Sequence, residues 1–285
     1  MQYLIGDLLV HLDSEYIVPG GNFMEQFLHE GGWNGETVTL ETMTQSLEPW
    51  LTERISSDNG VYEIHRHDGE MLLSYHWGNQ YHGFLIHPER FAVTFPPEMA
   101  HQPPIPADWF FSVSGFHRVL LHRKACVLHA SYIDAGGRAI LFTAPSGTGK
   151  STQAALWEQF AGAQTINGDR AVLRRREGVW HAFGYPCCGS SQISRNRTLP
   201  LGAVVVLEQS LENTVDILPA GQKIRALAAA MEFYHWDRSE MNMVFDLAME
   251  LAAEVPVVRL RCRPDEEAVH VLKHYLTGEG ILDGI

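Results

Sequence analysis

The sequence predicts an α/β protein with a mixed sheet and a small β-rich N-terminal domain. Three observations predict this fold: short runs that alternate apolar and polar residues, a strand–loop–helix pattern in the middle of the chain, and an uneven distribution of charge. Strict alternation is typical of strands, whereas apolar residues three or four apart are typical of helices. With 285 residues and 45% hydrophobic content, the chain can bury one large core or two smaller ones.

The N-terminal part predicts mostly strands. It opens with the apolar segment YLIGDLLVHL, and a stretch with helical spacing, TMTQSLEPWLTERI, follows. The alternating runs VYEIHRH, EMLLSYHW and QYHGFLIH, joined by the short turns DG and GN, predict an antiparallel meander. The Pro-rich piece FPPEMAHQPPIPAD then predicts a linker, and WFFSVSGFHRVLLHRK a packing helix. We therefore expect one domain over residues 1–105 and a second over residues 106–285.

Strands and helices alternate in the rest of the chain. CVLHASYI and RAILFTA predict strands, and TQAALWEQFAG predicts the helix after the loop PSGTGKS. Further strands are predicted at AVLRRR, VWHAFG, AVVVLEQ and VPVVRLR, and helices at GQKIRALAAAMEFY, SEMNMVFDLAMELAAE and PDEEAVHVLKHYL. This order of elements is typical of a sheet covered by helices.

Charge also divides the chain. Up to residue 115 there are 16 acidic and 3 basic residues, whereas the rest holds 18 of each, so the formal net charge of −13 belongs to the N-terminal part. A nucleic-acid partner is not expected, because such proteins present a basic face. Ordinary surface acidity is the simpler explanation of the charge, and recruitment of an acceptor with basic residues is the alternative.

The composition excludes several other classes. No apolar run reaches the roughly 18 residues of a membrane span, and the N-terminus lacks a secretory pattern, so we expect a cytoplasmic protein without membrane contact. A disulfide framework or zinc site is not expected, because the four cysteines lack C-x-x-C spacing. The histidines of HRH at 65–67 are expected to be solvated rather than to bind a metal.

The loop APSGTGKS matches the phosphate-loop pattern G-x-x-x-x-G-K-[ST], except that Ala144 replaces the first glycine. In such a loop backbone N–H groups and a helix N-terminus surround phosphate, the lysine reaches the terminal phosphates, and the hydroxyl holds Mg²⁺. Ala144 lies at the strand-to-loop junction, where a small residue with ordinary φ serves. We therefore predict ATP and Mg²⁺ as ligands, with Ser151 on the metal. The residues expected to bind the nucleotide are Ser146, Gly147, Thr148, Gly149, Lys150, Ser151 and Thr152.

Asp169 follows the short strand-like segment TIN, where a carboxylate returns to the edge of the sheet. Phosphoryl transfer needs a cation, Mg²⁺ and a carboxylate near the attacking hydroxyl. Asp169 is therefore a candidate base or metal ligand, and a turn-forming aspartate is the alternative. Arg195, with Arg197 in the loop GSSQISRNR, is a candidate phosphate clamp, against the alternative of an exposed loop arginine.

The segments VLHAS, APSGTGKST, INGDRAVL and GYP resemble the HPr kinase/phosphorylase family, whose wider fold is shared with the nucleotide domain of phosphoenolpyruvate carboxykinases. The resemblance runs from about residue 115 to the C-terminus. The N-terminal part resembles the β-rich appendages of HPr-kinase-like proteins, among them those found with modified-peptide gene clusters. The resemblance implies ATP-dependent phosphorylation of a serine-type hydroxyl in a peptide, protein or small molecule. Family members often form oligomers, so a homo-oligomer stays open.

By this resemblance Lys150 and Ser151 match the phosphate and metal positions, and Asp169 matches the second acid of an Asp-Asp pair. His129 matches a histidine beside the active site, although a core histidine on an apolar strand is an equal alternative. Gly168 stands where the family has the first acid, so a second metal contact and the reverse phosphorylase activity are not implied.

Two functions are consistent with these residues. The first is a serine kinase, and the second is a nucleotide-gated binding or regulatory module without phosphotransfer. Asp169 beside Lys150 and Ser151 favours the kinase, because a pure binding module does not need the carboxylate. Carboxylation of the carboxykinase kind fits less well, since a second, substrate-side set of basic residues is missing.

Overall fold

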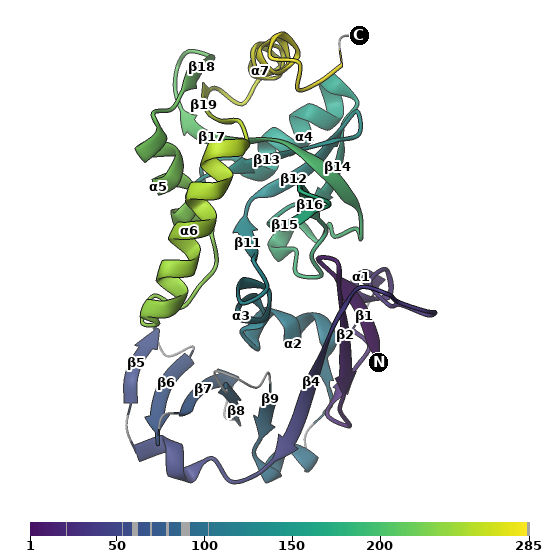
Figure 1. The fold of residues 1–285 in the computed structure, drawn as a ribbon, viewed down its shortest axis with the longest axis vertical. Coiled ribbons are helices and arrows are strands. Elements are labelled where there is room, and N and C mark those ends of the chain that lie inside the picture. Colours follow the sequence, from purple (N-terminus) through teal and green to yellow (C-terminus); the bar gives the residue numbers. More distant parts are fainter. Residues whose placement is uncertain are drawn as a thin grey trace. The chain divides into compact units, whose positions relative to one another are not determined.

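The computed structural model describes the chain except for residues 21, 53, 59–61, 69, 78–79, 87–91, 102 and 284–285. Its contacts divide the chain into two compact units, Met1–Phe116 and His117–Ile285 (Figure 1). Among the described residues, no helix combines the length and the apolar character needed to cross a bilayer.

The first unit contains a four-stranded sheet in the order β1-β2-β4-β9. β1 (Gln2–Ile5) pairs antiparallel with β2 (Leu8–Asp13), while β2, β4 (Glu36–Thr44) and β9 (Ala92–Phe95) are parallel. The turn between β1 and β2 uses Gly6 and Asp7 at φ 61° and 62°, which is the backbone conformation of a tight hairpin.

The predicted meander is confirmed in this unit. β5 (Arg54–Asp58), β6 (Tyr62–His67), β7 (Glu70–Trp77) and β8 (Gln80–Ile86) pair antiparallel in that order. Gly69, Gly78 and Asn79 of the two predicted turns lie outside the described residues. The expectation that the histidines of HRH are solvated is wrong for His65, which is buried with its Nε2 3.2 Å from Oε2 of Glu63. The side chain of His67 is 40% exposed.

The helix predicted over residues 42–55 is wrong. β4 continues to Thr44, only a 3-10 turn forms at η1 (Glu48–Thr52), and β5 follows. Thr42 and Thr44 pair with Val93 and Phe95 of β9, where β-branched side chains are well suited. Pro49 lacks the N–H that a continuing helix needs, so helical spacing alone was misleading.

The Pro-rich segment belongs to the first unit. It contains η2 (Pro97–His101) and β10 (Ile105–Pro106), which pairs with β3 (Ile17–Val18), and Ile105 is buried. The single packing helix expected after it is two short helices, α2 (Ala107–Val113) and α3 (Phe116–Leu121), because Gly115 adopts φ 71° between them. All of α3 after Phe116 lies in the second unit, whereas the first unit also contains the short helix α1 (Asn22–Glu25).

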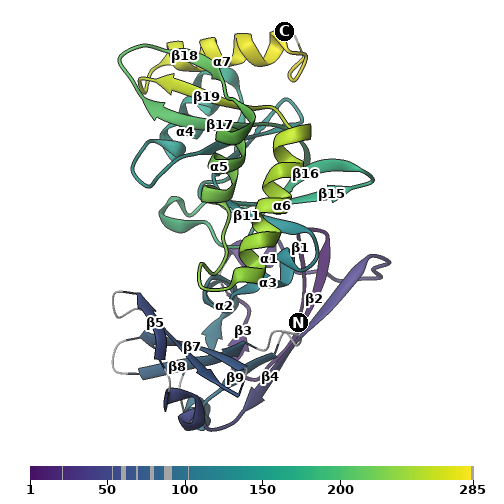
Figure 2. The same cartoon turned by 60° about the vertical axis from the view of Figure 1, so that its left-hand side comes forward.

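The second unit is built on a nine-stranded mixed sheet (Figure 2). Its centre is parallel: β17 (Thr198–Gln209) lies between β13 (Arg138–Thr143) and β19 (Val257–Cys262). The other strands pair antiparallel and are β11 (Ala125–His129), β12 (Ser131–Ala135), β14 (Gln164–Asn167), β15 (Arg170–Arg176), β16 (Val179–Phe183) and β18 (Thr214–Ile217). The segment CVLHASYI is two strands rather than one, because the chain changes neighbours at Ala130.

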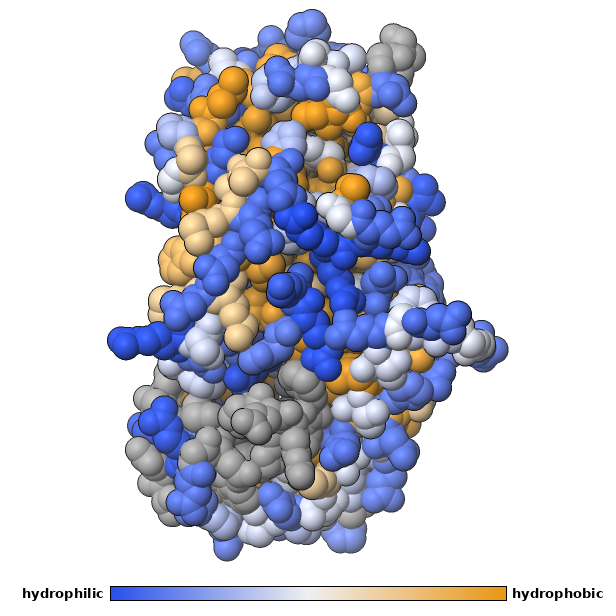
Figure 3. All heavy atoms as spheres, in the orientation of Figure 1, coloured by the Kyte–Doolittle hydropathy of each residue, from blue (hydrophilic) through white to orange (hydrophobic). Residues whose placement is uncertain are grey.

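Helices cover both faces of this sheet. They are α4 (Lys150–Ala161) and α7 (Glu266–Gly278) on one face, and α5 (Ala220–Ala230) and α6 (Arg238–Glu254) on the other. Successive residues of β13 point into different cores: Leu141 belongs to the cluster that contains Leu227 of α5, whereas the ring of Phe142 lies against that of Trp157 of α4. The predicted mixed α/β class is therefore confirmed. Some large apolar side chains of the second unit are exposed, among them Phe245 and Met249 of α6. Figure 3 shows hydrophobic areas among the hydrophilic ones on one face of the molecule.

Candidate functional site

The glycine-rich loop joins the end of β13 to the first turn of α4, as the sequence predicts. Gly147 and Gly149 have φ of 78° and 117°, a region that other residues rarely adopt. Ala144 is not among the positive-φ residues of the described chain, so a glycine is not required there. Gly149 caps α4 without a side-chain hydrogen bond, so no capping side chain occupies the N–H groups of the first turn. Such groups bind anions.

Lys150 is the first residue of α4 and is buried, with 8% of its surface exposed. Its Nζ donates to the carbonyl of Ala144 at 3.0 Å, so the side chain folds back over the loop. Burial lowers the pKa of Lys150, and the carboxylate of Asp169 opposes this effect. The hydroxyl of Thr143, the residue before Ala144, donates to the carbonyl of His129 at 3.0 Å, so the start of the loop lies next to the strand that carries His129.

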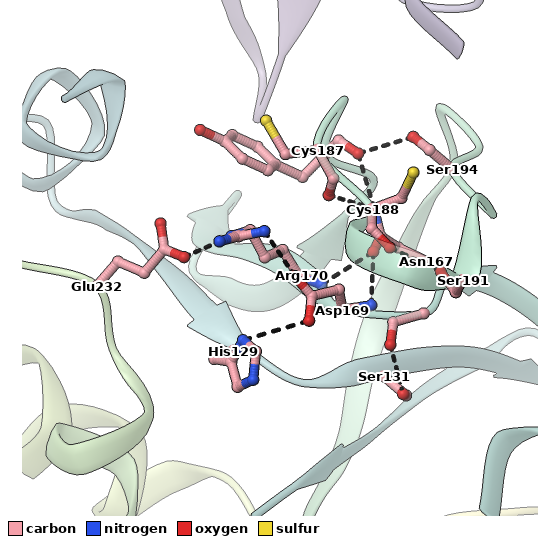
Figure 4. Close-up of polar contacts among 12 residues, drawn as sticks. His129, Ser131, Asn167, Asp169, Arg170, Cys187, Cys188, Ser191, Ser194 and Glu232 are labelled. Atoms are coloured by element: carbon pink, nitrogen blue, oxygen red, sulfur yellow. Dashed lines mark hydrogen bonds and ion pairs between the residues drawn. The ribbon is translucent and has the colours of Figure 1, made fainter. Parts of the chain in front are cut away.

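Asp169 lies in the turn between β14 and β15 and contacts two basic side chains. Its Oδ1 is 3.5 Å from Nδ1 of His129, and its Oδ2 accepts a hydrogen bond from Nη1 of Arg170 at 2.5 Å. Nε of Arg170 donates in turn to Glu232 at 2.5 Å. Figure 4 shows these four side chains linked one to the next, from His129 to Glu232, and we call them the Asp169 row.

Burial and neighbouring charges both shift the pKa values of the Asp169 row. Burial lowers the pKa of His129, and Lys150 and Arg170 lower it further, while Asp169 and Glu232 raise it. The neutral imidazole of His129 therefore predominates at neutral pH. Burial also opposes the charge of Arg170, but Glu232 and Asp169 outweigh it and raise the pKa of Arg170 above its usual value.

Asn167 fixes the backbone of this turn from a fully buried position. Its Oδ1 accepts hydrogen bonds from the N–H groups of Asp169 at 2.8 Å and Arg170 at 2.9 Å. Its Nδ2 donates to the carbonyls of Tyr185 at 2.7 Å and Cys187 at 3.1 Å. The amide thus ties the strand carrying Asp169 to the loop that follows β16.

Sequence reasoning missed Asn167, Arg170 and Glu232. The local signal for Asn167 is its place two residues before Asp169 in INGDR, because a buried asparagine often organises a turn. Arg170 is the next residue in the same segment and carried no separate signal. Glu232 lies 62 positions further along the chain, so only the fold brings it to the site.

Gly168 stands where the resemblance expects the first acid, and the structure gives a steric reason for the glycine. A Cβ at this position would lie 2.2 Å from Oγ and 2.4 Å from Cβ of Ser191. The Ser191 hydroxyl donates to the carbonyl of Cys188 at 2.7 Å and accepts from the N–H of Ile193 at 3.3 Å. Ser191 therefore fills the space that a side chain at residue 168 would need.

Gly168→Asp is expected to lower the free energy of unfolding by about 1–3 kcal/mol, because it overpacks the site against Ser191. Urea denaturation followed by circular dichroism measures the loss. Adding Ser191→Gly should recover most of it, since the obstructing atoms are gone. Gly221→Asp is the matched control, because a Cβ there meets no atom within 4 Å. Native stability in Gly168→Asp would show that the loop around Ser191 can move to make room for the aspartate at no cost in stability.

Arg195 is not linked to the Asp169 row by the contacts described. Its Nε donates to the carbonyl of Thr165 at 3.1 Å, and the residue is exposed. Arg197 pairs with Asp134 at 2.6 Å. A role for Arg195 in clamping phosphate stays a prediction. Ser146, Ser151 and Thr152 are exposed at the loop and the start of α4, where their side chains are accessible.

A cavity of about 710 Å³ opens beside the glycine-rich loop. Its walls come from the loop, the first turn of α4 and the ends of β17 and β19. The lining residues are Gly147, Thr148, Gly149, Thr152, Gln153, Leu207, Glu208, Gln209, Ser210, Leu211, Cys262, Arg263 and Pro264. Its volume is that of a typical small-molecule site. The loop therefore lines this cavity, and Thr143 just before the loop contacts His129 of the Asp169 row.

The fold and these residues define an α/β protein with a glycine-rich strand–loop–helix and an adjoining carboxylate–histidine site. A family model described as SynChlorMet cassette protein ScmC matches residues 110–267, which is more than half of the chain. The chain therefore belongs to the ScmC family. The matched region includes the glycine-rich loop and the whole Asp169 row.

Comparisons with individual proteins give less. No curated protein matches the chain. Among solved structures, it is similar to the Hpr(Ser) kinase/phosphatase from Coxiella burnetii, with 14% sequence identity and a TM-score of 0.31, over 54% of this chain and 93% of that one. A likeness this distant carries no argument about the site, so the chemistry has to be inferred from the residues themselves.

Proposed function

We propose that the chain is an ATP-dependent phosphotransferase that moves the γ-phosphoryl group to a serine-type hydroxyl of a peptide, protein or small molecule. One observation carries the proposal: the hydroxyl of Thr143, the last residue of β13 before the glycine-rich loop, donates to the carbonyl of His129 at 3.0 Å, so the loop begins beside the histidine that faces Asp169. Phosphoryl transfer requires positioned phosphates, a neutralising cation and a carboxylate for the attacking hydroxyl. The glycine-rich loop would position the phosphates, Lys150 would supply positive charge, and Asp169 would supply the carboxylate.

The loop supports ATP as the donor. Gly147 and Gly149 permit a backbone in which N–H groups can converge on phosphate, and α4 adds the positive end of its dipole. The cavity of about 710 Å³ beside the loop has room for the nucleoside. The triphosphate would then extend from the cavity over the loop toward Lys150.

Mg²⁺ suits the same residues. In the described part of the chain, no group of three or more His, Cys, Asp or Glu side chains could hold a metal by itself. Mg²⁺ bound with a nucleotide typically needs only one or two protein ligands, with phosphate oxygens and water supplying the rest. Ser151 and the partly exposed Asp169 are suitable ligands. When bound, the ion would neutralise charge on the phosphates.

The Asp169 row supplies a general base for the hydroxyl that attacks ATP. The acceptor hydroxyl oxygen attacks the γ-phosphorus, its proton passes to the carboxylate of Asp169, and the bond from the γ-phosphorus to the bridging oxygen breaks to release ADP. The imidazole of His129 lies beside that carboxylate, with Nδ1 3.5 Å from Oδ1. Lys150 balances negative charge on the transferring group.

A nucleotide-gated binding module is the second candidate, and one contact favours it. Asp169 already forms an ion pair with Arg170 at 2.5 Å, which makes its carboxylate a weaker base. Such a module would bind ATP through the same loop and would need no acceptor.

Incubation with γ-labelled ATP and Mg²⁺ separates the two functions. Serine peptides, free serine and cell extract serve as acceptors, and mass spectrometry detects the adduct. The phosphotransferase is expected to give labelled acceptor and ADP in equal amounts. Binding of ATP by calorimetry without any labelled acceptor would favour the module instead.

A further inference from the structure

We propose that Arg170, held in place by Glu232, is a positioning residue that keeps the carboxylate of Asp169 directed toward His129. The contacts of Arg170 with Asp169 and Glu232 define its place in the row. The effect of Arg170 on the transfer rate rests on the proposed phosphotransferase function.

Arg170 uses two different nitrogens for its two partners. Nη1 donates to Oδ2 of Asp169 and Nε donates to Oε1 of Glu232, both at 2.5 Å. A guanidinium group is planar, so fixing one edge on Glu232 also fixes the direction of the other nitrogens. Because Arg170 takes Oδ2, the remaining oxygen of Asp169 is the one that faces His129.

Glu232, the anchor, hydrogen-bonds to the strand that carries His129, the target. The N–H of Glu232 donates to the carbonyl of Val127 at 2.9 Å, and Met231 forms a bridge with Leu128. His129 follows on the same strand, β11, and pairs in register with Arg170 of β15. The backbone positions at both ends of the row are therefore set by the β11–β15 ladder and by the segment after α5.

The row differs from an ordinary surface ion pair. The exposed fractions of the Asp169, Arg170 and Glu232 side chains are 21%, 26% and 28%. Partly shielded pairs are screened less by salt than exposed ones, which contribute little. Releasing Asp169 from Arg170 is therefore expected to move the carboxylate rather than to leave it in place.

The decisive experiment is crystallographic and compares the Asp169 side chain in the native chain, Arg170→Gln and Arg170→Lys. The distance from Oδ1 of Asp169 to Nδ1 of His129, 3.5 Å in the native chain, should lengthen in Arg170→Gln, because nothing then holds Oδ2. Arg170→Lys should restore the native distance only in part, since an ammonium group lacks the planar fork. An unchanged Asp169 carboxylate in Arg170→Gln would overturn the proposal.

The kinetic arm uses the same variants. Arg170→Gln should slow single-turnover transfer by about 10- to 100-fold through misplacement of Asp169, with ATP affinity within about twofold of native. Arg170→Lys keeps the charge without the fork and should recover only part of the rate. Arg175→Gln is the control, because Arg175 lies on β15 like Arg170 but pairs with Glu254 of α6. This variant should transfer at the native rate.

The outcomes separate this inference from the proposed function. A native rate in Arg170→Gln would overturn the positioning role. A native chain that transfers no phosphoryl group would remove the phosphotransferase proposal, and the crystallographic comparison would still decide where Arg170 holds Asp169. If Arg170→Gln does not fold, Glu232→Gln removes the anchor and gives the same comparison.

Discussion

Asp169→Asn is expected to lower the single-turnover rate of phosphoryl transfer by about 10³- to 10⁴-fold, at the upper end of the range for loss of a general base. The asparagine has nearly the same shape but neither charge nor a ready site for the proton. Because this loss falls mainly on the transition state, ATP affinity should change little. No second acid can substitute, since Gly168 replaces the neighbouring one and Glu232 is held by Arg170.

Rapid-quench measurement of ADP and labelled acceptor checks this expectation. The turn itself should survive, because Asn167 holds it through the backbone N–H of residue 169 and not through the carboxylate. Asp134→Asn, which removes the partner of Arg197 elsewhere in the sheet, is the matched control. A variant that keeps more than about a tenth of the native rate would show that Asp169 only shapes the turn.

The glycine-rich loop could be predicted from sequence because its signal is local. The strand before it, the two glycines that need positive φ and the helix after it lie within 23 consecutive residues, Ala139–Ala161. The same segment explains why Ala144 is tolerated, since its position at the end of β13 does not need positive φ. Local backbone requirements of this kind are visible in residue identity.

The Asp169 row could be predicted only in part because it depends on pairing between distant segments. His129 and Arg170 face each other through the β11–β15 ladder, and Glu232 arrives from the segment after α5. Neither the pairing of β11 nor the path after α5 has a signal in residue spacing. The wrong helix over residues 42–55 has a related cause, because pairing of β4 with β9 outweighed helical spacing.

Lys150→Ala is expected to weaken ATP binding by about 10- to 100-fold, the loss of one or two charge-assisted hydrogen bonds to phosphate. Transfer should fall further than binding, below detection, because Lys150 also balances charge that develops during transfer. The fold should persist: alanine favours helices, and the described hydrogen bond of the side chain is the one to the Ala144 carbonyl. Calorimetry with ATP and Mg²⁺ measures the affinity.

Two further variants make the Lys150 result specific. Lys150→Met keeps most of the side-chain volume, so equal losses in the alanine and methionine variants would assign the effect to charge rather than to packing. Lys273→Ala on α7, which does not line the cavity, should bind ATP as the native chain does. If both Lys150 variants bind ATP with native affinity, the glycine-rich loop is not the phosphate site, because a lysine folded over a phosphate-binding loop would contribute to that affinity.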